Sequence, residues 1–594
     1  MKETVKNLDA LRGEMRKYGV SAIIIPGTDP HQSEYISPYW KLRDWVTGFT
    51  GSNGTAAVTL EKAGLWTDSR YFLQAELELA DSGIVLYKED VPGDPTVNEW
   101  LAENMQEGDV LAVNGKLFSI VQAGRLENFC GENGFRFAAD FDPFPKIYGD
   151  RPQLPLDPIY IHEEKYAGES TKSKISRLLE QCEKHDADAI LLSALDEIAW
   201  TLNIRGNDVE FNPVAIAYAY ISKSDKVLFI NEKKVDKEVR GYLESCGVKV
   251  AGYEDLESFL GKLKNATILL DPNKTSDTVA RWILNCPTVY AASPVALLKA
   301  VKNDVQLNGV RNAMERDGAA LVKLYMWLEK NVPTGNVKET DVAKKAMEFR
   351  GESPLYRGES FGMIAGYKAH GAIVHYEATE ESASTLANDG LLLIDTGAQY
   401  LDGTTDITRT IALGTPTADE RHDYTLVLKG HVTLASAIYP AGTRGSQLDA
   451  LARQFLWKEC KTFWHGTGHG VGHFLNVHEG PQNIRLNENP AVLLPGMITS
   501  DEPGLYVTGK YGIRIENLIH SQSYRHTDDF GDFMNFEVLT LFPYDSKLID
   551  LSMLSDDELA WINNYHATVR EQLTPYLNEE QQAWLNDKTK ELKR

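Results

Sequence analysis

Two segments of the C-terminal half place acidic residues directly after apolar strands, and this arrangement constrains the fold more than any other feature. Residues 390–412, GLLLIDTGAQYLDGTTDITRTIA, indicate an apolar strand, a turn at 401–403 and a Thr-rich return strand. In this hairpin we expect Asp395 and Asp406 to face each other. Because a carboxylate at the edge of a core is costly unless a cation neutralises it, the hairpin predicts a bound cation.

The second segment, 498–520, repeats this layout. Its sequence is ITSDEPGLYVTGKYGIRIENLIH, in which Glu502 and Glu516 are equidistant from a turn at Gly509. A regular hairpin sets these two carboxylates opposite each other, and like charges across a ladder are destabilising unless a cation lies between them. The two segments share an acid, a Gly, a Tyr, a turn Gly and a late Arg. We therefore expect two related hairpins that face each other.

A histidine-rich stretch lies between the hairpins. Residues 465–481, HGTGHGVGHFLNVHEGP, contain His465, His469, His473 and His478. Four glycines between the first three histidines would each cost up to about 1 kcal/mol in a helix, so we expect an extended, closely packed backbone. In a strand the first three histidines share a face but are too widely spaced to bind one metal together. Each is also compatible with a hydrogen-bonded histidine in a glycine-rich turn, so the sequence alone leaves the ligand unassigned.

The expected donor set is four carboxylates and one imidazole, which is too much charge for one small ion and suits two. Oxygen donors with one nitrogen favour manganese, with zinc or cobalt as alternatives. Paired ions activate a bridging water and stabilise both sides of a displacement. The pattern therefore predicts metal-assisted hydrolysis.

The N-terminal half contains a duplicated layout. Residues 8–26 and 175–193 each show a helix pattern followed by a β-branched run, then an irregular stretch and a second pair of strands. Strands alternating with helices indicate an α/β unit, here present twice. The proline-rich segment 142–158 is the expected linker between the copies.

The third region begins with a long helix capped near Asn303. Its end is helical, with a capping box formed by Ser555 and Glu558, and we assign the final stretch to packing or to an oligomer surface. The expected domains are residues 1–155, 156–302 and 303–594.

Composition narrows the class of partner. Acidic residues outnumber basic ones by 85 to 61, a net charge of −24, which argues against nucleic acid and anionic membranes. The five cysteines are far apart and form no CxxC pair, so we expect reduced and mostly buried thiols. Neither a signal peptide nor an apolar run of about 20 residues is present. We expect a cytoplasmic protein.

Five ordered motifs resemble those of the X-prolyl aminopeptidase (aminopeptidase P) family, in the group with prolidase, methionine aminopeptidase and creatinase. They are HGAIVHY (370–376), DTGAQYLDGTTDITRT (395–410), HGTGHGVGHFLNVHEGP (465–481), EPGLY (502–506) and GIRIEN (512–517). In the N-terminal half, HQSEY, GFTGSNGTA and WTDSRYF resemble the long, three-domain cytosolic form. The chain departs from the family pattern at His370 and at His473, where smaller residues are expected; His473 is left without a role.

The resemblance implies an α/β (α+β) fold class, with two creatinase-like α/β domains followed by a pita-bread metallopeptidase catalytic domain. It also implies a homodimer through the catalytic domains and two divalent metal ions per chain. Asp406 and Glu516 would bridge the two ions, Asp395 would complete the shell of one ion, and His469 and Glu502 would complete the shell of the other.

The resemblance further implies removal of the N-terminal residue from peptides with proline in the second position, by attack of a metal-bridging hydroxide on the scissile carbonyl. Glu502 would act as general base. Hydrogen bonds from His478 and His375 would stabilise the oxyanion and the peptide carbonyls. The resemblance also implies that Tyr506, Arg514, Arg70 and His469 contact or orient the substrate and that His465 supports the site.

Of three alternative functions, two are enzymes and one is a binding protein. Prolidase, which acts on Xaa-Pro dipeptides, is the closest, but the duplicated N-terminal half favours longer substrates. A non-catalytic protein-binding scaffold with the pita-bread fold is disfavoured because all five ligand positions are retained. The segment GESFG, 358–362, matches a serine-hydrolase elbow, but the sequence before Ser360 is polar and contains proline, unlike the apolar strand that an elbow requires.

Overall fold

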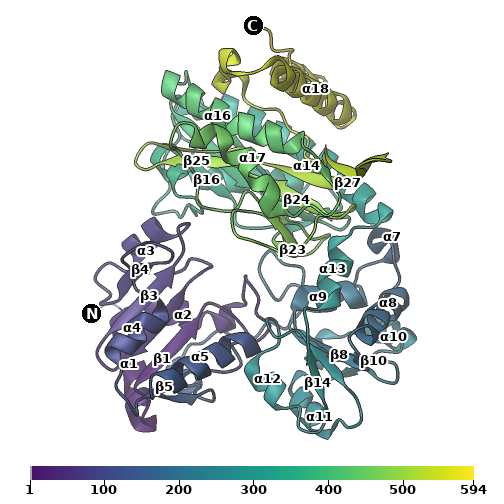
Figure 1. Ribbon diagram of the computed structural model, residues 1–594. Helices are drawn as coiled ribbons and strands as arrows, with labels where there is room; N and C mark the ends of the chain where they lie inside the picture. Colours follow the sequence, from purple (N-terminus) through teal and green to yellow (C-terminus); the bar gives the residue numbers. More distant parts are fainter. Residues whose placement is uncertain (1–2) are drawn as a thin grey trace. The chain divides into compact units, whose positions relative to one another are not determined.

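The N-terminal half contains two six-stranded sheets with the same topology (Figure 1). A computed structural model describes residues 3–594 and divides the chain into two units. The first unit comprises the chain up to Glu163 together with Glu169–Ala296, and the second comprises Glu164–Gly168 and Leu297–Arg594. Among the described residues, no helix has the length and apolar character needed to cross a membrane.

The first sheet has the order β4-β3-β2-β1-β5-β6. Its strands are β1 (Ala22–Pro26), β2 (Thr55–Thr59), β3 (Ala63–Thr67), β4 (Val85–Lys88), β5 (Val110–Ala112) and β6 (Arg136–Ala138). The helices of this part are α1 (Glu3–Tyr18), α2 (Leu42–Thr47), α3 (Phe72–Glu78), α4 (Val97–Asn104), α5 (Ile120–Glu132) and α6 (Phe144–Ile147). Apolar residues of α1 and of β1 are buried in one core.

The second sheet has the order β12-β11-β10-β8-β13-β14. Its strands are β8 (Ala189–Leu192), β10 (Ala217–Ser222), β11 (Lys226–Ile230), β12 (Lys249–Ala251), β13 (Ile268–Leu270) and β14 (Thr288–Tyr290), and the short strands β7 (Tyr160–Ile161) and β9 (Ile204–Arg205) pair separately. Its helices are α8 (Thr171–Glu183), α9 (Leu195–Leu202), α10 (Lys237–Ser245), α11 (Leu256–Lys262), α12 (Asp277–Arg281) and α13 (Pro294–Ala300).

The two sheets match pair by pair. In each sheet a central strand, β1 or β8, pairs in parallel with one neighbour, β5 or β13, and antiparallel with the first strand of a hairpin, β2 or β10. At both edges of each sheet the outermost strand pairs in parallel with its neighbour. The predicted duplication is therefore confirmed. The stretches expected to be irregular contain short helices, α2 in the first copy and α9 in the second.

The cysteines depart in part from expectation. All five are free thiols, as predicted. Only Cys130 and Cys182 are buried, whereas Cys246 and Cys286 are partly exposed and Cys460 is exposed. The prediction of mostly buried thiols is wrong, because the sequence around an isolated cysteine does not report its burial.

The first long helix of the second unit is α14 (Asp304–Asn331), capped by the Asn303 side chain as predicted. It continues with α15 (Glu339–Arg350), β15 (Tyr356–Glu359), β16 (Ile364–Tyr367), β17 (Leu391–Thr396), β18 (Ala398–Tyr400), β19 (Gly403–Thr404), β20 (Ile407–Ala412), α16 (Ala418–Ala435), β21 (Ile438–Pro440) and α17 (Gly445–Trp457). The remaining elements are β22 (Gly468–Gly470), β23 (Glu479–Ile484), β24 (Ile498–Asp501), β25 (Gly504–Val507), β26 (Tyr511–Arg514), β27 (Asn517–Thr527), β28 (Gly531–Val538), α18 (Asp556–Leu573) and α19 (Glu579–Lys588). The short helix α7 (Glu164–Ala167) also packs on this unit.

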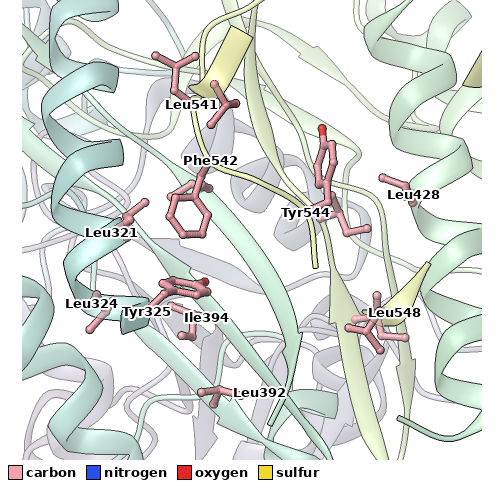
Figure 2. Packing of buried hydrophobic residues seen from close by; sticks show 14 of the residues in the cluster. Leu321, Leu324, Tyr325, Leu392, Ile394, Leu428, Leu541, Phe542, Tyr544 and Leu548 are labelled. Carbon is pink, nitrogen blue, oxygen red and sulfur yellow. The ribbon is translucent and has the colours of Figure 1, made fainter. Parts of the chain in front are cut away.

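Two sheets form the centre of the second unit. One has the order β16-β17-β20 and the other β21-β28-β27-β24-β22-β23. Figure 2 shows the core beside β17, where Tyr325 of α14 lies near Phe542, with Ile394 of β17 close by. The residue after Ile394 is Asp395, so a large apolar core holds the strand end that carries this carboxylate. The predicted capping box at Ser555 is present at the start of α18, and α18 and α19 contact α14.

Candidate metal centre

The first acidic hairpin forms, but its register differs from expectation. Strand β17 pairs with β20 so that Asp395 lies opposite Thr408 and not opposite Asp406. A pairing of Asp395 with Asp406 would require a turn centred on Tyr400 and Leu401. The observed turn is centred on Leu401 and Asp402, one position later. Asp406 is therefore diagonal to Asp395, and since side chains alternate along strands the two carboxylates remain on one face.

The second hairpin has the expected register. Asp501 pairs with Asn517 on one side and Gly504 pairs with Arg514 on the other, so both ladders place Glu502 opposite Glu516. The two hairpins also contact each other. The Glu516 N–H donates to the Thr408 carbonyl at 3.1 Å, and the Thr410 hydroxyl donates to the Arg514 carbonyl at 3.0 Å.

The histidine-rich stretch is extended at its centre, in strand β22, and this confirms that it is not a helix. Glycine is required there, because a Cβ at Gly468 would lie 1.9 Å from the Ser500 carbonyl oxygen and one at Gly470 would lie 2.2 Å from the Glu479 carbonyl oxygen. This close packing brings the intervening His469 to the hairpins. Its Nε2 is 3.4 Å from Asp406 Oδ2 and 3.5 Å from Glu502 Oε1.

The other nitrogen of His469 orients the ring. Nδ1 lies 2.9 Å from the Gly470 carbonyl oxygen, and a carbonyl can only accept, so Nδ1 carries a proton. This leaves Nε2 directed at the carboxylates, an arrangement common among metal-binding histidines.

Three donors form a compact group that could hold a metal ion. One ligand atom from each of Asp406, His469 and Glu516 lies within 4.8 Å of the others. Beside them, Asp395 Oδ1 is buried and has no hydrogen-bond partner among the described residues. A buried carboxylate oxygen without a donor is costly, and a bound cation would remove that cost. The residues present therefore fit the predicted pair of divalent ions.

The electrostatics of the carboxylates lead to the same conclusion. Burial raises the pKa of Glu502 to about 7, although the positive charges of His469 and Arg514 oppose the shift. The pKa values of Asp395 and Glu516 are also raised, first by burial and then by neighbouring carboxylates. Burial lowers the pKa of His469, but the bond to Asp406 and the charge of Glu502 outweigh it and raise the pKa to about 9. This concentration of mutually repelling acids is typical of a site built for cations.

A chain of hydrogen bonds supports Asp395. Arg514 Nη2 donates to Asp395 Oδ2 at 2.6 Å, and Arg514 Nη1 donates to the Tyr506 hydroxyl at 2.7 Å. That hydroxyl lies 2.8 Å from His465 Nε2. The same guanidinium also donates at 3.4 Å to the carbonyl of Val374, which is the residue before His375.

The remaining predicted residues occupy different places. The ring of His478 lies 4.4 Å from that of His469, measured between centroids, so it adjoins the donor group. Arg70 belongs to the first unit, where its Nη2 pairs with Asp68 at 2.7 Å. His473 is buried and does not belong to the compact metal-binding group. His375 lies in the segment that follows helix η5 (Lys368–Ala372).

Several residues that position the ligands were not predicted. Arg409 donates from Nη1 to the Glu516 carbonyl and from Nη2 to Asn517 Oδ1 at 2.8 Å. His431 lies 3.1 Å from Asp501 Oδ2, next to Glu502. Asp501 and Asn517 directly adjoin the predicted ligands Glu502 and Glu516 in the sequence, but their partners are too distant in the chain to be inferred.

The structure excludes the serine-hydrolase interpretation. Ser360 is fully buried and its hydroxyl donates to the Thr405 carbonyl at 2.9 Å. The next element is strand β16, whereas a nucleophile elbow must be followed by a helix. A strand, β15, does precede Ser360, although none was expected from the polar sequence there.

Family models cover most of the chain. Residues 7–139 and 150–306 each match a creatinase/prolidase N-terminal domain, residues 308–522 match the metallopeptidase family M24, and residues 532–592 match the C-terminal region of peptidase M24. These matches establish the expected fold class: two creatinase-like domains and a pita-bread domain.

Full-length relatives are also similar. Aminopeptidase P2 of Arabidopsis thaliana is 40% identical over 97% of this chain and 86% of its own length, and a probable Xaa-Pro aminopeptidase P of Coprinopsis cinerea is 38% identical over 99% and 98%. The X-prolyl aminopeptidase of Caenorhabditis elegans, described as a cytosolic enzyme with a dinuclear active site, superimposes over 100% of both chains with a TM-score of 0.96 and 32% identity. An Xaa-Pro dipeptidase of Bacillus anthracis, 23% identical with a TM-score of 0.51, covers 63% of this chain and shares the fold alone. The chain belongs to the Xaa-Pro aminopeptidase P family of the M24 metallopeptidases.

Proposed function

We propose that this protein is a dinuclear-metal aminopeptidase that removes the N-terminal residue from peptides with proline in the second position. The observation that carries the proposal is the convergence of Asp395, Asp406, His469, Glu502 and Glu516 at adjoining hairpins. The full-length similarity to proteins named Xaa-Pro aminopeptidase supports the substrate class.

The five residues would hold two divalent ions. We assign Asp406 and Glu516 to both ions, Asp395 to one, and His469 and Glu502 to the other. When bound, the ions would supply Lewis acidity and a nucleophilic water at neutral pH. Oxygen donors dominate the set, so manganese is the proposed metal, ahead of zinc and cobalt.

The chain's own residues then complete the chemistry. A carboxylate oxygen of Glu502 accepts the proton of the attacking water. His478, beside His469, and His375 donate hydrogen bonds to the scissile carbonyl as its oxygen becomes negative. Arg514 and Tyr506 hold Asp395 in place, and His465 supports the Tyr506 hydroxyl. We assign Arg70 to substrate contact from the first unit.

The proposed specificity has a physical basis. An Xaa-Pro bond is a tertiary amide that lacks an N–H and has a fixed φ, so peptidases that bind this N–H do not process it. A dedicated site is therefore needed. The N-terminal domains, with Arg70, are the part of the chain to which we assign recognition of peptides longer than two residues.

Cleavage of defined peptides tests the proposal. The protein is incubated with Mn²⁺ and Xaa-Pro-Yaa, Xaa-Pro and Met-Ala-Yaa peptides, and products are followed by mass spectrometry. Release of only the first residue from Xaa-Pro-Yaa is the expected result. Cleavage confined to the dipeptide would identify a prolidase, and no cleavage with either Mn²⁺ or Zn²⁺ would reject the enzymatic function.

Three further assignments accompany the proposal. We propose a homodimer through the catalytic domains. Trp464 and Phe530, which are 76% and 80% exposed, supply apolar surface on the catalytic domain. Light scattering tests the oligomeric state. The cytosol is the proposed location, and the proposed domain boundaries are residues 1–155, 156–302 and 303–594.

A further inference from the structure

A buried glutamate outside the metal centre binds both ends of the segment that carries His375. Glu339 is the first residue of α15 and is fully buried. Its carboxylate receives hydrogen bonds from four groups, which all belong to residues 367–384. They are the Tyr367 N–H at 2.8 Å, His370 Nδ1 at 3.0 Å, the Tyr376 hydroxyl at 3.0 Å and the Ser384 N–H at 2.7 Å.

These donors fill the carboxylate. An ionised carboxylate offers about four lone-pair sites, and the four donors occupy all of them. Tyr367 and His370 donate from the start of the segment, and Tyr376 and Ser384 donate from further along it. His370 lies 3.0 Å from both oxygens, and because a carboxylate can only accept, Nδ1 of His370 carries the proton. The Glu339 N–H also donates to the Ser384 carbonyl at 3.1 Å, so Glu339 bonds to Ser384 through backbone and side chain.

The rings of this segment pack on each other. His370 and Tyr376 stack with centroids 4.4 Å apart and planes 29° apart, and Tyr376 is the residue after His375. His370, where a smaller residue was expected, contributes both a donor to Glu339 and a surface for Tyr376. The consequence is a fixed path for the backbone on either side of His375.

The segment also contacts the hairpin that carries Glu502 and Glu516. A Cβ at Gly512 in β26 would lie 1.6 Å from the Gly371 carbonyl oxygen, so the two backbones are in direct contact. Arg514 Nη2, which holds Asp395 at 2.6 Å, reaches the Val374 carbonyl at 3.4 Å. The segment is therefore held between Glu339 on one side and the ligand-bearing hairpin on the other.

We infer that Glu339, with His370 and Tyr376 as its partners, is a positioning residue that sets the place of His375 relative to the scissile carbonyl. The inference rests on the proposed function. A displacement of about 1 Å in a group that contacts the reacting atoms can cost about 100-fold in rate. Glu339 would therefore act through His375, because its carboxylate is already occupied by four donors of the segment.

A double-mutant cycle tests the inference in the full-length, Mn²⁺-loaded protein. We expect His375→Ala to lower kcat for Xaa-Pro-Yaa by about 100-fold and Glu339→Gln to lower it by about tenfold or more, with KM changed less. In the His375→Ala background, Glu339→Gln should cost little further, because the group it positions is gone. Metal content should be unchanged in each variant.

Two variants keep the test decisive if Glu339→Gln folds poorly. Tyr376→Phe removes one of the four donors at nearly constant side-chain shape and should also lower kcat. In the His375→Ala background, Tyr376→Phe should cost little further. Asp389→Asn is the matched control, since the exposed Asp389 accepts a hydrogen bond from the Tyr367 hydroxyl at 2.6 Å but lies outside the segment, and the substitution should leave kcat unchanged.

Fully additive losses from Glu339→Gln and His375→Ala, or loss of bound metal in Glu339→Gln, would overturn the inference. Failure of the wild-type protein to cleave Xaa-Pro-Yaa would instead reject the proposed function. The two failures are therefore distinguishable.

Discussion

Arg514 Nη2 lies 2.6 Å from Asp395 Oδ2, and this buried ion pair joins the two acidic hairpins. The same guanidinium binds the Tyr506 hydroxyl and the Thr408 hydroxyl, at 2.7 and 3.2 Å. One planar group thus orients a candidate ligand and its neighbours at once, which an ammonium cannot reproduce.

Arg514→Lys should therefore weaken metal binding by about 10- to 100-fold, because groups that orient metal ligands contribute this much to affinity. Titration calorimetry with Mn²⁺ measures the change. Arg525→Lys, on the exposed part of β27, is the control and should bind Mn²⁺ like the wild type. Equal affinity in Arg514→Lys would show that Asp395 is held by other contacts.

Glu516→Gln should abolish turnover and loosen the metal. Glu516 is assigned to both ions, and the neutral amide supplies neither the charge nor the second oxygen that bridging requires. Its Oε2 also accepts from the Thr408 hydroxyl at 2.8 Å, so the substitution should leave the fold intact. Peptide cleavage and metal analysis test this, with exposed Glu571→Gln as control; unchanged activity would reject the bridging role.

Removal of the metal should lower thermal stability. Without ions, Asp395, Glu502 and Glu516 repel one another and Asp406 in a buried site. Ions that bind only the folded state add about 2.7 kcal/mol of stability at a free concentration 100 times Kd. The unfolding temperature of chelator-treated protein should rise with added Mn²⁺, and a temperature independent of Mn²⁺ would contradict the assignment.

Glu479 should contribute strongly to stability. Lys299 and Lys302 each place Nζ 2.7 Å from its carboxylate, and all three side chains are no more than 3% exposed. Glu479→Ala removes the carboxylate that both buried ammonium groups share and should cost about 3–5 kcal/mol in the free energy of unfolding. Lys299→Met leaves a neutral Lys302–Glu479 pair and should cost less. Urea unfolding measures both, and equal losses would mean that packing, not charge, accounts for the effect.

His566 should make folding sensitive to acid. Burial lowers its pKa from 6.5 to about 4, and its Nε2 accepts a hydrogen bond from the Tyr544 N–H at 3.1 Å. Between pH 6.5 and 4 the unfolded chain binds a proton here that the folded chain does not, so stability falls as pH falls through this window. The contribution is at most about 3 kcal/mol.

Denaturation of His566→Gln across this pH range checks the sign. The variant should lose less stability between neutral pH and pH 4 than the wild type, whereas exposed His526→Gln should behave like the wild type. An identical pH dependence in His566→Gln would assign the effect to other groups.

Local patterns in the sequence determined much of this protein. The caps at Asn303 and Ser555, the duplicated α/β layout and the turns of the acidic hairpins each depend on residues a few positions apart, so they could be predicted. The opposition of Glu502 and Glu516 followed from a symmetric turn. The position of acidic residues directly after apolar strands was enough to predict bound cations. Burial of an unpaired charge is costly, whichever elements the strand packs against.

Only the tertiary structure decided which groups meet. The two-residue turn at Leu401 and Asp402 set Asp395 opposite Thr408, and the packing of β22 brought His469, of the four histidines, into the compact donor group. Partners more than a hundred residues apart, such as Arg514 with Asp395, or Lys302 with Glu479, leave no periodic signal in the chain. Sequence patterns report local geometry and burial, whereas pairing across the fold depends on how whole elements pack, and that is why the supporting contacts of the site appeared only in three dimensions.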